Sequence, residues 1–363
     1  MNEIAQKEGR LRALLQEKGL DALLLRRASS FAWATGGASG YVNTATDVGA
    51  AALLFTPEGK FVLTNNIEAP RLEREEGLVA KGFTQRVAPW HEGGPDPAAI
   101  AKGLRLGADM PYPGAVDLSA EVCRLRTHLL PEEQERYRLV GRLCGEAIAA
   151  ATRRVRPGQT EHEIAALLAE ETTARGILPI VNLVATDERI FAFRHPLPTG
   201  KRLEKYAMIV LCGRMYGLVG AVTRLVHFGR LPDEVRRKAE AVARVDAAMI
   251  AASRPGVRLS DVFRKAQETY AAVGFADEWQ LHHQGGPVSY EPREMIATPT
   301  THETLAVGMA CAWNPSITGT KSEDTILVGE RENEVITPSP DWPTLSVVID
   351  GKPYPRPAIL EIV

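Results

Sequence analysis

The chain has 363 residues, of which 45% are hydrophobic and 24% are charged, a composition typical of a globular protein with room for two domains. Lys and Arg number 43 against 45 for Asp and Glu, so the formal net charge of −2 gives no general attraction to nucleic acid or to an anionic membrane. No apolar run approaches the roughly 18 residues that a membrane span needs, and the first twenty residues lack the apolar core of a signal peptide. The expected location is therefore the cytoplasm.

The first 128 residues indicate a small α/β domain, which precedes a long helix expected from about Pro131. Residues 3–18 have apolar positions at helical spacing, and the turn at 57–59 between two apolar runs is typical of a β-hairpin. The expected elements, in chain order, are a helix at 3–18, strands at 21–25, 50–55 and 60–64, a helix at 66–76 and a strand at 104–108.

Residues 129–363 contain an internal repeat. The tripeptide Arg-Pro-Gly at 156–158 recurs 98 positions later at 254–256, and at the same offset Gly176 falls on Gly274. In both copies a long helix runs into the tripeptide and a second helix ends at the glycine, as a duplication would produce. We therefore predict a pseudo-twofold α+β domain with helices outside and a sheet within. Its strands are expected at 179–186, 207–212 and 216–227 after the first copy, and at 278–282, 308–313, 324–328 and 345–349 after the second.

Two polar stretches lie near the expected strand ends of the second copy. Leu281–Glu294 reads LHHQGGPVSYEPRE, and Trp313–Val328 reads WNPSITGTKSEDTILV. The first stretch has too many charges and glycines for an ordinary core segment, and its glycines allow a ligand to approach the backbone closely. The two stretches are candidates for an active site. A solvated loop with two incidental histidines is the alternative.

The chain resembles the pita-bread enzymes, a family that includes prolidase, aminopeptidase P, methionine aminopeptidase and creatinase. The resemblance implies a creatinase-like N-terminal domain at 1–128 and a pita-bread catalytic domain at 129–363. It also implies a homodimer in which the N-terminal domain of one subunit covers the site of the other. Four segments carry it: 194–198 (RHPLP), 221–224 (AVTR), 283–292 (HQGGPVSYEP) and 314–328 (NPSITGTKSEDTILV).

The peptidases of this family bind two metal ions through two Asp, one His and two Glu, and this chain matches only part of that set. His283 and Glu323 stand at two of these positions. The other positions hold Ala221, Asn314 and either Val210 or Leu211.

Residues 205–232 contain no Asp or Glu, although two of the metal-binding carboxylates should come from this region. A pair of hard cations needs several anionic oxygens. We therefore predict that the chain has no dinuclear metal site and uses no cofactor. A single weakly held metal on His283 and Glu323 is the alternative.

Creatinase is the precedent within the family for chemistry without a metal. This chain shares an alanine at 221 with creatinase, and Arg293-Glu294 resembles the Arg-Glu pair that follows the histidine run there. As the resemblance implies, such an enzyme cleaves a C–N bond of a small guanidino compound and uses a histidine as a proton shuttle. Thr223 and Tyr290 depart from creatinase, which has a glutamate and a histidine at these places. Creatine itself is therefore not the expected substrate.

The resemblance and the side-chain chemistry together suggest three catalytic residues. His195 would act as a general base, because a histidine titrates near neutral pH, and His283 would donate a hydrogen bond to a developing oxyanion. Glu323 would accept from an amine or set the tautomer of a histidine. The alternatives are a surface loop histidine, a structural histidine–glutamate pair and a surface charge at a strand end. His282 alternates with His283 along the expected strand and is predicted to face away from the site.

Further residues are candidates for substrate binding. Arg293 and Glu294 offer a guanidinium fork for a carboxylate and an acid for a cationic group, and a solvated ion pair is the alternative. The expected aspartates are missing, and Lys321 and Arg224 lie near the same strand ends. The pocket should therefore carry more positive charge than in the peptidases. A small anionic or zwitterionic substrate is therefore expected. The candidates are Tyr290, Arg293, Glu294, Asn314 and Arg224.

The sequence leaves three functions open. The favoured one is metal-independent hydrolysis of a C–N bond in a small amino-acid-like compound, with histidine as the proton shuttle. The second is a metal-dependent Xaa-Pro dipeptidase or aminopeptidase with a degraded ligand set. The third is a catalytically silent protein that binds a ligand or a partner.

Overall fold

The structure is a computed structural model that describes residues 2–363, which form two compact units. The smaller unit holds the chain up to Glu133 together with Tyr216–Leu218, and the larger unit holds Gln134–Met215 and Val219–Val363. Both units combine helices with sheets, which confirms the predicted α+β class. The domain boundary at residue 128 stays a prediction. No helix within residues 2–363 is long and apolar enough to cross a membrane.

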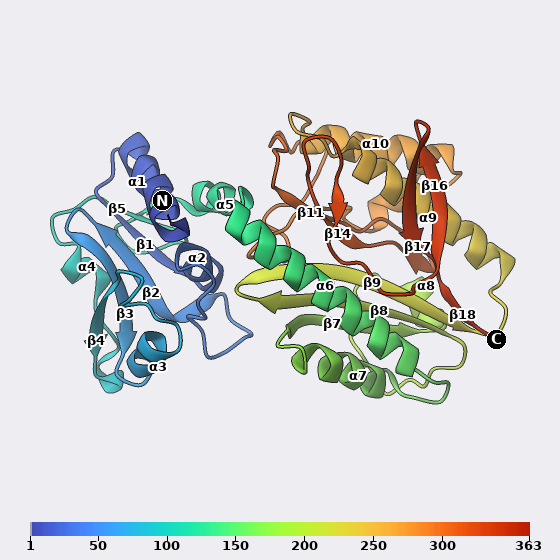
Figure 1. Cartoon of the computed structure of the whole chain (residues 1–363), viewed down its shortest axis with the longest axis horizontal. Helices are drawn as coiled ribbons and strands as arrows, with labels where there is room; N and C mark the ends of the chain where they lie inside the picture. Colours follow the sequence, from blue (N-terminus) through green and yellow to red (C-terminus); the bar gives the residue numbers. More distant parts are fainter. Residues whose placement is uncertain (1) are drawn as a thin grey trace. The chain divides into compact units, whose positions relative to one another are not determined.

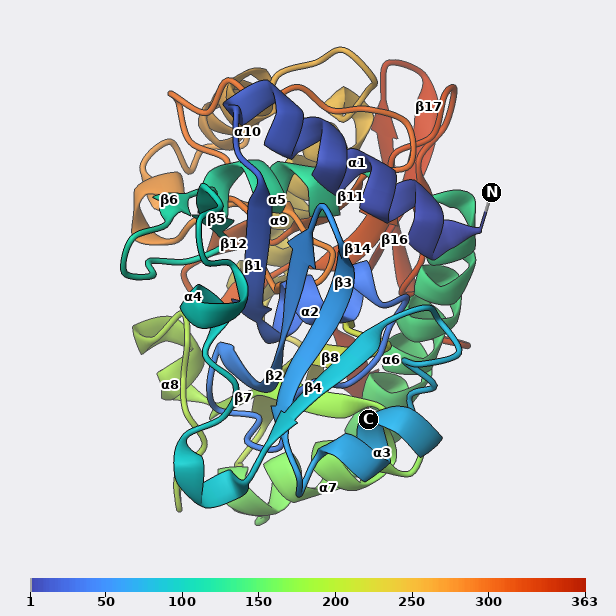
Figure 2. The same ribbon diagram turned by 90° about the vertical axis from the view of Figure 1, so that its left-hand side faces the viewer.

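The smaller unit is built on a six-stranded sheet. Its strands are β1 (Ala22–Arg27), β2 (Val48–Thr56), β3 (Gly59–Asn65), β4 (Thr84–Ala88), β5 (Leu106–Ala108) and β6 (Val116–Asp117). They lie in the order β4-β3-β2-β1-β5-β6, and Figure 2 shows β1 to β4 side by side. The central pairs β1–β2 and β2–β3 are antiparallel, and the outer pairs are parallel. The antiparallel β2–β3 pair confirms the predicted hairpin.

The helices predicted at 3–18 and 66–76 correspond to α1 (Glu3–Lys18) and α3 (Ala69–Arg74), and the other helices of the smaller unit were not predicted. α1 buries its apolar stripe, as expected for an amphipathic helix. α3 begins later than the predicted helix at 66–76, because the side-chain oxygen of Asn65 accepts from the N–H groups of Ile67 at 2.9 Å and Glu68 at 3.1 Å. Such a local turn competes with helix formation. The elements are α1 (Glu3–Lys18), α2 (Ala28–Ala34), α3 (Ala69–Arg74), the 3-10 helix η1 (Trp90–Glu92), α4 (Pro97–Ile100) and α5 (Ser119–Thr127).

Two four-stranded sheets form the interior of the larger unit. The first contains β7 (Leu178–Thr186), β8 (Tyr206–Met215), β9 (Leu218–Phe228) and β18 (Leu360–Ile362), in the order β18-β9-β8-β7. The second contains β10 (Gly285–Pro287), β11 (Ala310–Trp313), β14 (Asp324–Leu327) and β15 (Glu334–Val335), in the order β10-β11-β14-β15. Two ribbons accompany them, β12 (Ser316–Ile317) with β13 (Thr320–Lys321), and β16 (Thr344–Ile349) with β17 (Lys352–Pro357).

The two sheets meet along β9 and β14. The N–H of Ala221 donates to the hydroxyl oxygen of Thr325 at 2.9 Å, and that hydroxyl donates to the carbonyl oxygen of Ala221 at 2.9 Å. The N–H of Thr223 donates to the carbonyl oxygen of Glu323 at 3.2 Å. Because β9 belongs to the first half of the repeat and β14 to the second, the junction brings polar groups of both halves together.

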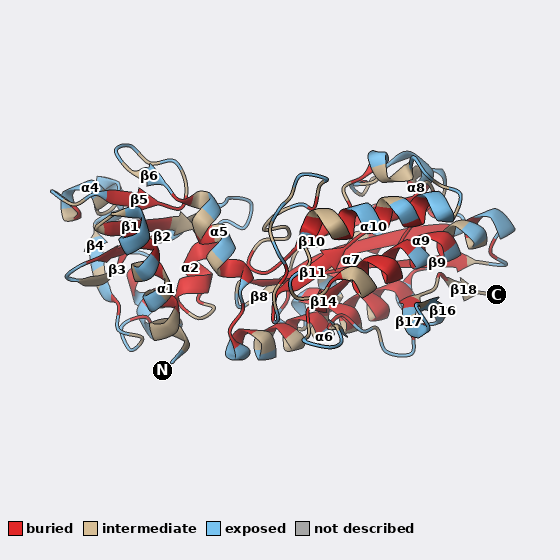
Figure 3. Cartoon of the chain, turned by 90° about the horizontal axis from the view of Figure 1, so that it is seen from above, coloured by how far each residue is buried: buried red, intermediate tan, exposed pale blue. Residues whose placement is uncertain are grey.

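Helices cover the sheets of the larger unit. Figure 1 shows α6 (Pro131–Arg154) and α7 (Glu161–Thr173) running along the β9-β8-β7 sheet. Figure 3 shows that β8, β9, β11 and β14 are almost wholly buried, while α7, α9 and α10 keep exposed residues on one side. α6 packs closely because Gly213 has no side chain, since a Cβ there would lie 2.6 Å from the sulfur of Cys144. The elements are α6 (Pro131–Arg154), α7 (Glu161–Thr173), α8 (Glu188–Ala192), α9 (Asp233–Ala252), α10 (Leu259–Ala272) and the 3-10 helix η2 (Glu278–Leu281).

Hydrogen bonds at the two turns confirm the internal repeat. Gly158 and Gly256 both have a positive φ, 87° and 85°, and their N–H groups donate to the carbonyl oxygens of Leu203 and Leu305, each at 2.8 Å. Each leucine N–H donates back to the residue that follows the glycine, at 2.8 and 2.9 Å. Two turns with the same hydrogen bonds at equivalent places are what a duplicated unit predicts.

The strand expected at 278–282 is wrong. Residues 278–281 form the 3-10 helix η2, and the strand of this segment starts only at Gly285. Gly285 has a φ of +95°, and a Cβ there would overlap the carbonyl oxygen of Ala312, so only glycine fits. Because no regular strand passes through His282 and His283, side-chain alternation does not apply to them.

Candidate active site

Three histidines gather at the C-terminal end of the η2 turn. His195 lies in the loop after α8, and its Nε2 is 3.1 Å from Nε2 of His282. The ring centroids of His282 and His283 are 4.5 Å apart, and one ring nitrogen from each of the three residues lies within 4.8 Å of the others. His195 is exposed, His283 is half-buried and His282 is buried. The structure thus brings the predicted His195 and His283 together with a histidine that the sequence analysis set aside.

The expectation that His282 faces away is therefore corrected. It rested on strand alternation, and the chain at this point is the end of a 3-10 helix followed by an extended residue. Nδ1 of His282 faces the hydroxyl oxygen of Ser316 at 3.5 Å, a distance too long for a strong hydrogen bond. The Nε2 contact with His195 is the strong one. The adjacent pair of histidines was the only sequence signal that could have indicated this role.

The loop that carries His195 is held by an ion pair. Nη2 of Arg194 donates to the carboxylate of Glu278 at 2.7 Å and to the hydroxyl of Thr318 at 3.0 Å. The same carboxylate accepts from the N–H and the hydroxyl of Thr318, each at 3.0 Å. Glu278 therefore ties the histidine loop to the start of η2 and to the β12–β13 ribbon, which limits where the His195 ring can lie.

Glu323 is the centre of a buried charged cluster beside the histidines. Its Oε1 accepts from Nη2 of Arg293 at 2.9 Å, and its Oε2 accepts from Nζ of Lys321 at 2.8 Å and from the hydroxyl of Thr223 at 2.6 Å. Burial alone would raise the pKa of Glu323, but Lys321 and Arg293 outweigh burial and lower the pKa to about 2. The cluster thus holds two cations and one anion at neutral pH.

The histidines are uncharged at neutral pH. Burial lowers the pKa of His195, and the positive charge of Lys321 lowers it further. Burial lowers the pKa of His283 to about 4 and that of His282 to about 2, and Lys321 acts in the same direction on both. Neutral imidazoles beside two cations and one carboxylate leave the site with an excess positive charge, while the preference for an anionic or zwitterionic ligand stays a prediction.

Two buried polar atoms of the predicted binding residues lack a protein partner. Nε of Arg293 has no acceptor, and Oδ1 of Asn314, a residue that is 2% exposed, has no donor among residues 2–363. Buried polar groups in proteins are nearly always hydrogen-bonded. A donor and an acceptor left open at one site are therefore places where a ligand could bind.

Glu294 and Tyr290 shape the loop that follows β10. Oε1 of Glu294 accepts from the hydroxyl of Ser289 at 2.7 Å and from the N–H of Tyr290 at 3.1 Å. Tyr290 is 2% exposed. These contacts give Glu294 a part in holding the loop that carries Arg293, and contact with a substrate stays a prediction for both residues.

Arg224 does not face the site, which corrects its assignment to substrate binding. All five of its N–H donors are used within the protein, and the side chain is 3% exposed. Its Nη2 donates to Asp324 at 2.9 Å, and Asp324 is shared with Arg356, which also binds Asp246 at 2.8 Å. Arg224 therefore belongs to a buried ion network between β9, β14, β17 and α9, with no donor left for a ligand.

The residues do not fit a dinuclear metal centre. At the positions where the family resemblance places aspartates, Ala221 and either Val210 or Leu211 are apolar and buried. The two oxygens of Glu323 already accept from an ammonium, a guanidinium and a hydroxyl. The three histidines could supply nitrogen ligands to a single transition-metal ion, but the two neighbouring cations oppose the approach of a dication.

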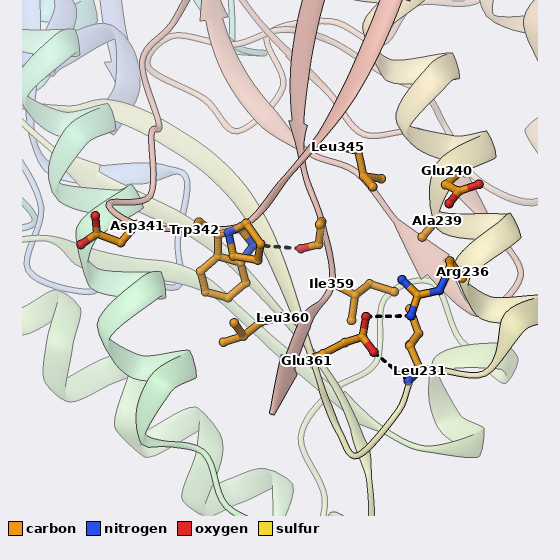
Figure 4. Close-up of a pocket in the computed structure, with 12 residues that line it drawn as sticks. Leu231, Arg236, Ala239, Glu240, Asp341, Trp342, Leu345, Ile359, Leu360 and Glu361 are labelled. Carbon is orange, nitrogen blue, oxygen red and sulfur yellow. Dashed lines mark hydrogen bonds and ion pairs between the residues drawn. The ribbon is translucent and has the colours of Figure 1, made fainter. Parts of the chain in front are cut away.

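A separate cavity of about 410 Å³ lies between α9 and the C-terminal strands (Figure 4). Three of its polar side chains are bonded within the protein: Glu361 pairs with Arg236 at 2.8 Å and accepts from the N–H of Leu231 at 2.9 Å, and the indole N–H of Trp342 donates to a carbonyl oxygen. None of the three clustered histidines lines it. Because this cavity lies apart from the three histidines, the histidine cluster remains the candidate site.

Comparison with known proteins places this site in a family. Residues 135–330 match metallopeptidase family M24, and residues 9–120 match the creatinase/prolidase N-terminal domain. The chain is 25% identical over 222 residues to a Xaa-Pro dipeptidase of Pyrococcus furiosus, which covers 59% of this chain and 64% of that protein. It is 29% identical over 184 residues to the agropine synthesis cyclase of Rhizobium rhizogenes, which covers 47% of this chain and 46% of that protein.

Coverage and fold similarity complete the comparison. The chain spans slightly under two thirds of the length of three curated relatives, 65%, 65% and 64%. Its fold is similar to that of a Xaa-Pro dipeptidase from Bacillus anthracis, with a TM-score of 0.79 over 99% of this chain and 100% of that chain, at 19% identity. The resemblance to the pita-bread enzymes is thereby confirmed, and the family match over more than half of the chain shows that this protein belongs to metallopeptidase family M24 and carries a creatinase/prolidase N-terminal domain.

Proposed function

We propose that this protein hydrolyses a C–N bond in a small amino-acid-like compound and does so without a dinuclear metal centre. The observation that supports the proposal is the cluster around Glu323. A carboxylate that stands at a metal-ligand position of the family is bonded to Lys321 and Arg293, at 2.8 and 2.9 Å. Protein cations thus take the place that divalent ions would need, while the histidines beside them stay neutral.

In the proposed reaction His195 is the general base. It takes a proton from a water molecule, whose oxygen attacks the carbonyl carbon while the C=O electron pair moves onto the oxygen. The N–H of Gly285 donates to Nδ1 of His283 at 3.3 Å, so the neutral His283 ring carries its proton on Nε2. That N–H can donate to the oxyanion. When the C–N bond breaks, protonated His195 returns the proton to the leaving nitrogen, giving a carboxylic acid and an amine.

The charges of the site define the substrate class. Arg293 has a free Nε beside its bonded Nη2, and a guanidinium suits a carboxylate. Asn314 offers an acceptor for a substrate N–H. We therefore propose a small anionic or zwitterionic substrate, with Tyr290 and Glu294 shaping the pocket wall. A homodimer, a cytoplasmic location and a domain boundary at residue 128 belong to the same proposal.

Two observations support other functions. The relatives named as Xaa-Pro dipeptidases support a metal-dependent peptidase, although the ligand set here opposes it. The relative named as a cyclase supports a reaction in which a nucleophile of the substrate itself replaces water and closes a ring. A silent binding protein would use the same pocket without turnover.

Elemental analysis and turnover with a chelator separate these functions. The purified protein is assayed for bound metals and is incubated with a panel of acylated amino acids, guanidino acids and Xaa-Pro dipeptides, with and without EDTA. We expect turnover that EDTA leaves unchanged, and a loss of about 10²–10⁴ in kcat for His195→Ala. The exposed His302→Ala serves as the matched control. Two tightly bound metals per chain, or activity that EDTA abolishes, would contradict the proposal.

A further inference from the structure

Lys321 is a buried ammonium with spare donors. Its side chain is 4% exposed on β13, and its Nζ lies 2.8 Å from Oε2 of Glu323. An ammonium has three N–H donors, and Glu323 is the one acceptor found for it among the residues that the structure describes. Leaving buried donors unbonded costs free energy. Lys321 is therefore placed to bind a further acceptor.

Arg293 has the same excess of donors on the other side of the carboxylate. Its Nη2 binds Oε1 of Glu323 at 2.9 Å, its Nη1 binds the carbonyl oxygen of Pro292 at 2.5 Å, and its buried Nε binds nothing in residues 2–363. Glu323 has only two oxygens, and the hydroxyl of Thr223 already shares one of them. The cluster therefore contains more donors than acceptors, as a site for an oxyanion would.

We propose that Lys321 is a further catalytic residue, which donates a hydrogen bond to the carbonyl oxygen under attack and stabilises the oxyanion that forms. The inference rests on the proposed hydrolysis, and it names the residue that stabilises the negative charge formed when water attacks the carbonyl carbon. Arg293 is the better match for a substrate carboxylate, because its planar fork binds two oxygens, whereas an ammonium is a compact charge suited to one oxygen.

The position of Lys321 agrees with this role. Its positive charge lowers the pKa of His195, His282 and His283, so the ammonium lies close enough to act electrostatically on the proposed base. A base and an oxyanion donor must both lie close to one reacting carbon. The competing explanation is that Lys321 only neutralises Glu323. In that case, replacing Lys321 would change the free energy of unfolding but would leave kcat unchanged.

Substitutions of Lys321 test the role in turnover. We expect Lys321→Met to lower kcat by about 10²–10³, the usual effect of losing one oxyanion donor, with little change in KM. Lys321→Arg should keep part of the rate, and ethylammonium added to Lys321→Ala should restore part of it. The exposed Lys265→Met is the matched control. Variants that fold as the wild type does and keep its kcat would overturn the proposal.

Sulfate binding tests the same site without turnover. Calorimetric titration with sulfate, a tetrahedral oxyanion, should give saturable binding to the wild type and to Lys265→Met, and at least tenfold weaker binding to Lys321→Met. Equal sulfate affinity in the wild type and Lys321→Met, or no binding to either, would overturn the inference. If sulfate binding depends on Lys321 but no substrate is turned over, the proposed hydrolysis fails and the oxyanion site stands. If substrates are hydrolysed and Lys321→Met keeps full kcat, only the role of Lys321 fails.

Discussion

Replacement of Glu323 by glutamine tests the charged cluster on which the proposed site depends. The substitution keeps the shape of the side chain and removes the anion that Lys321 and Arg293 share. Breaking a buried ion pair by removing one partner costs about 3–5 kcal/mol, because the remaining charge stays buried and uncompensated. We therefore expect Glu323→Gln to lower the free energy of unfolding by several kcal/mol at pH 7.

The pKa of Glu323 gives a second, independent value for the free energy by which this carboxylate stabilises the fold. The pKa is about 2 in the folded protein against an ordinary value of 4.5, and at 1.36 kcal/mol for each pKa unit this corresponds to about 3 kcal/mol of stability. Because the folded pKa is lowered, this stability is present above pH 4.5 and is lost as the pH falls from 4.5 toward 2. The two estimates agree in size although they start from different quantities.

Urea unfolding of the wild type and Glu323→Gln, measured from pH 7 to pH 3, is the assay. The difference in unfolding free energy should be about 3 kcal/mol at pH 7 and should shrink as the pH falls below 4.5. The exposed Glu330→Gln should match the wild type at every pH. A difference that stays below about 0.5 kcal/mol, the usual range for surface substitutions, or one that does not change with pH, would refute the reasoning.

Three further results are expected. His282→Ala should lower kcat about fivefold, because losing one hydrogen bond that orients His195, worth about 1 kcal/mol, raises the barrier accordingly; kinetics as fast as the wild type would contradict this. The acid limb of the kcat–pH profile should lie below pH 6.5, because the pKa of His195 is lowered and the base is lost only when its ring is protonated. An acid limb above pH 6.5 would exclude His195 as the base. Arg356→Ala should lower the unfolding free energy by about 3–5 kcal/mol in urea, because Asp246 and Asp324 lose their shared buried partner, whereas the exposed Arg331→Ala should change it little.

Much of the fold follows from local patterns in the sequence. The hairpin of β2 and β3, the repeat of α6–α7 as α9–α10 and the strands β7, β8, β9, β11, β14 and β16 were predicted, because apolar periodicity and glycine turns act over a few residues. The strand expected at 278–282 was wrong. Residues 278–281 form the 3-10 helix η2, and the strand of this part of the chain begins only at Gly285.

For the candidate site too, some features follow from the sequence and others only from the tertiary structure. The sequence by itself determined which chemical groups are present: the histidines, the depleted carboxylates at Ala221 and Asn314, and the charges of residues 321–323. Only the tertiary structure decided which of these groups meet. His282 turns toward His195 because the chain leaves η2 before any strand begins, and Arg224 turns into a buried ion network because Asp324 lies on the neighbouring strand. Contacts between segments more than eighty residues apart depend on how the two halves of the repeat pack, and no local pattern encodes that packing.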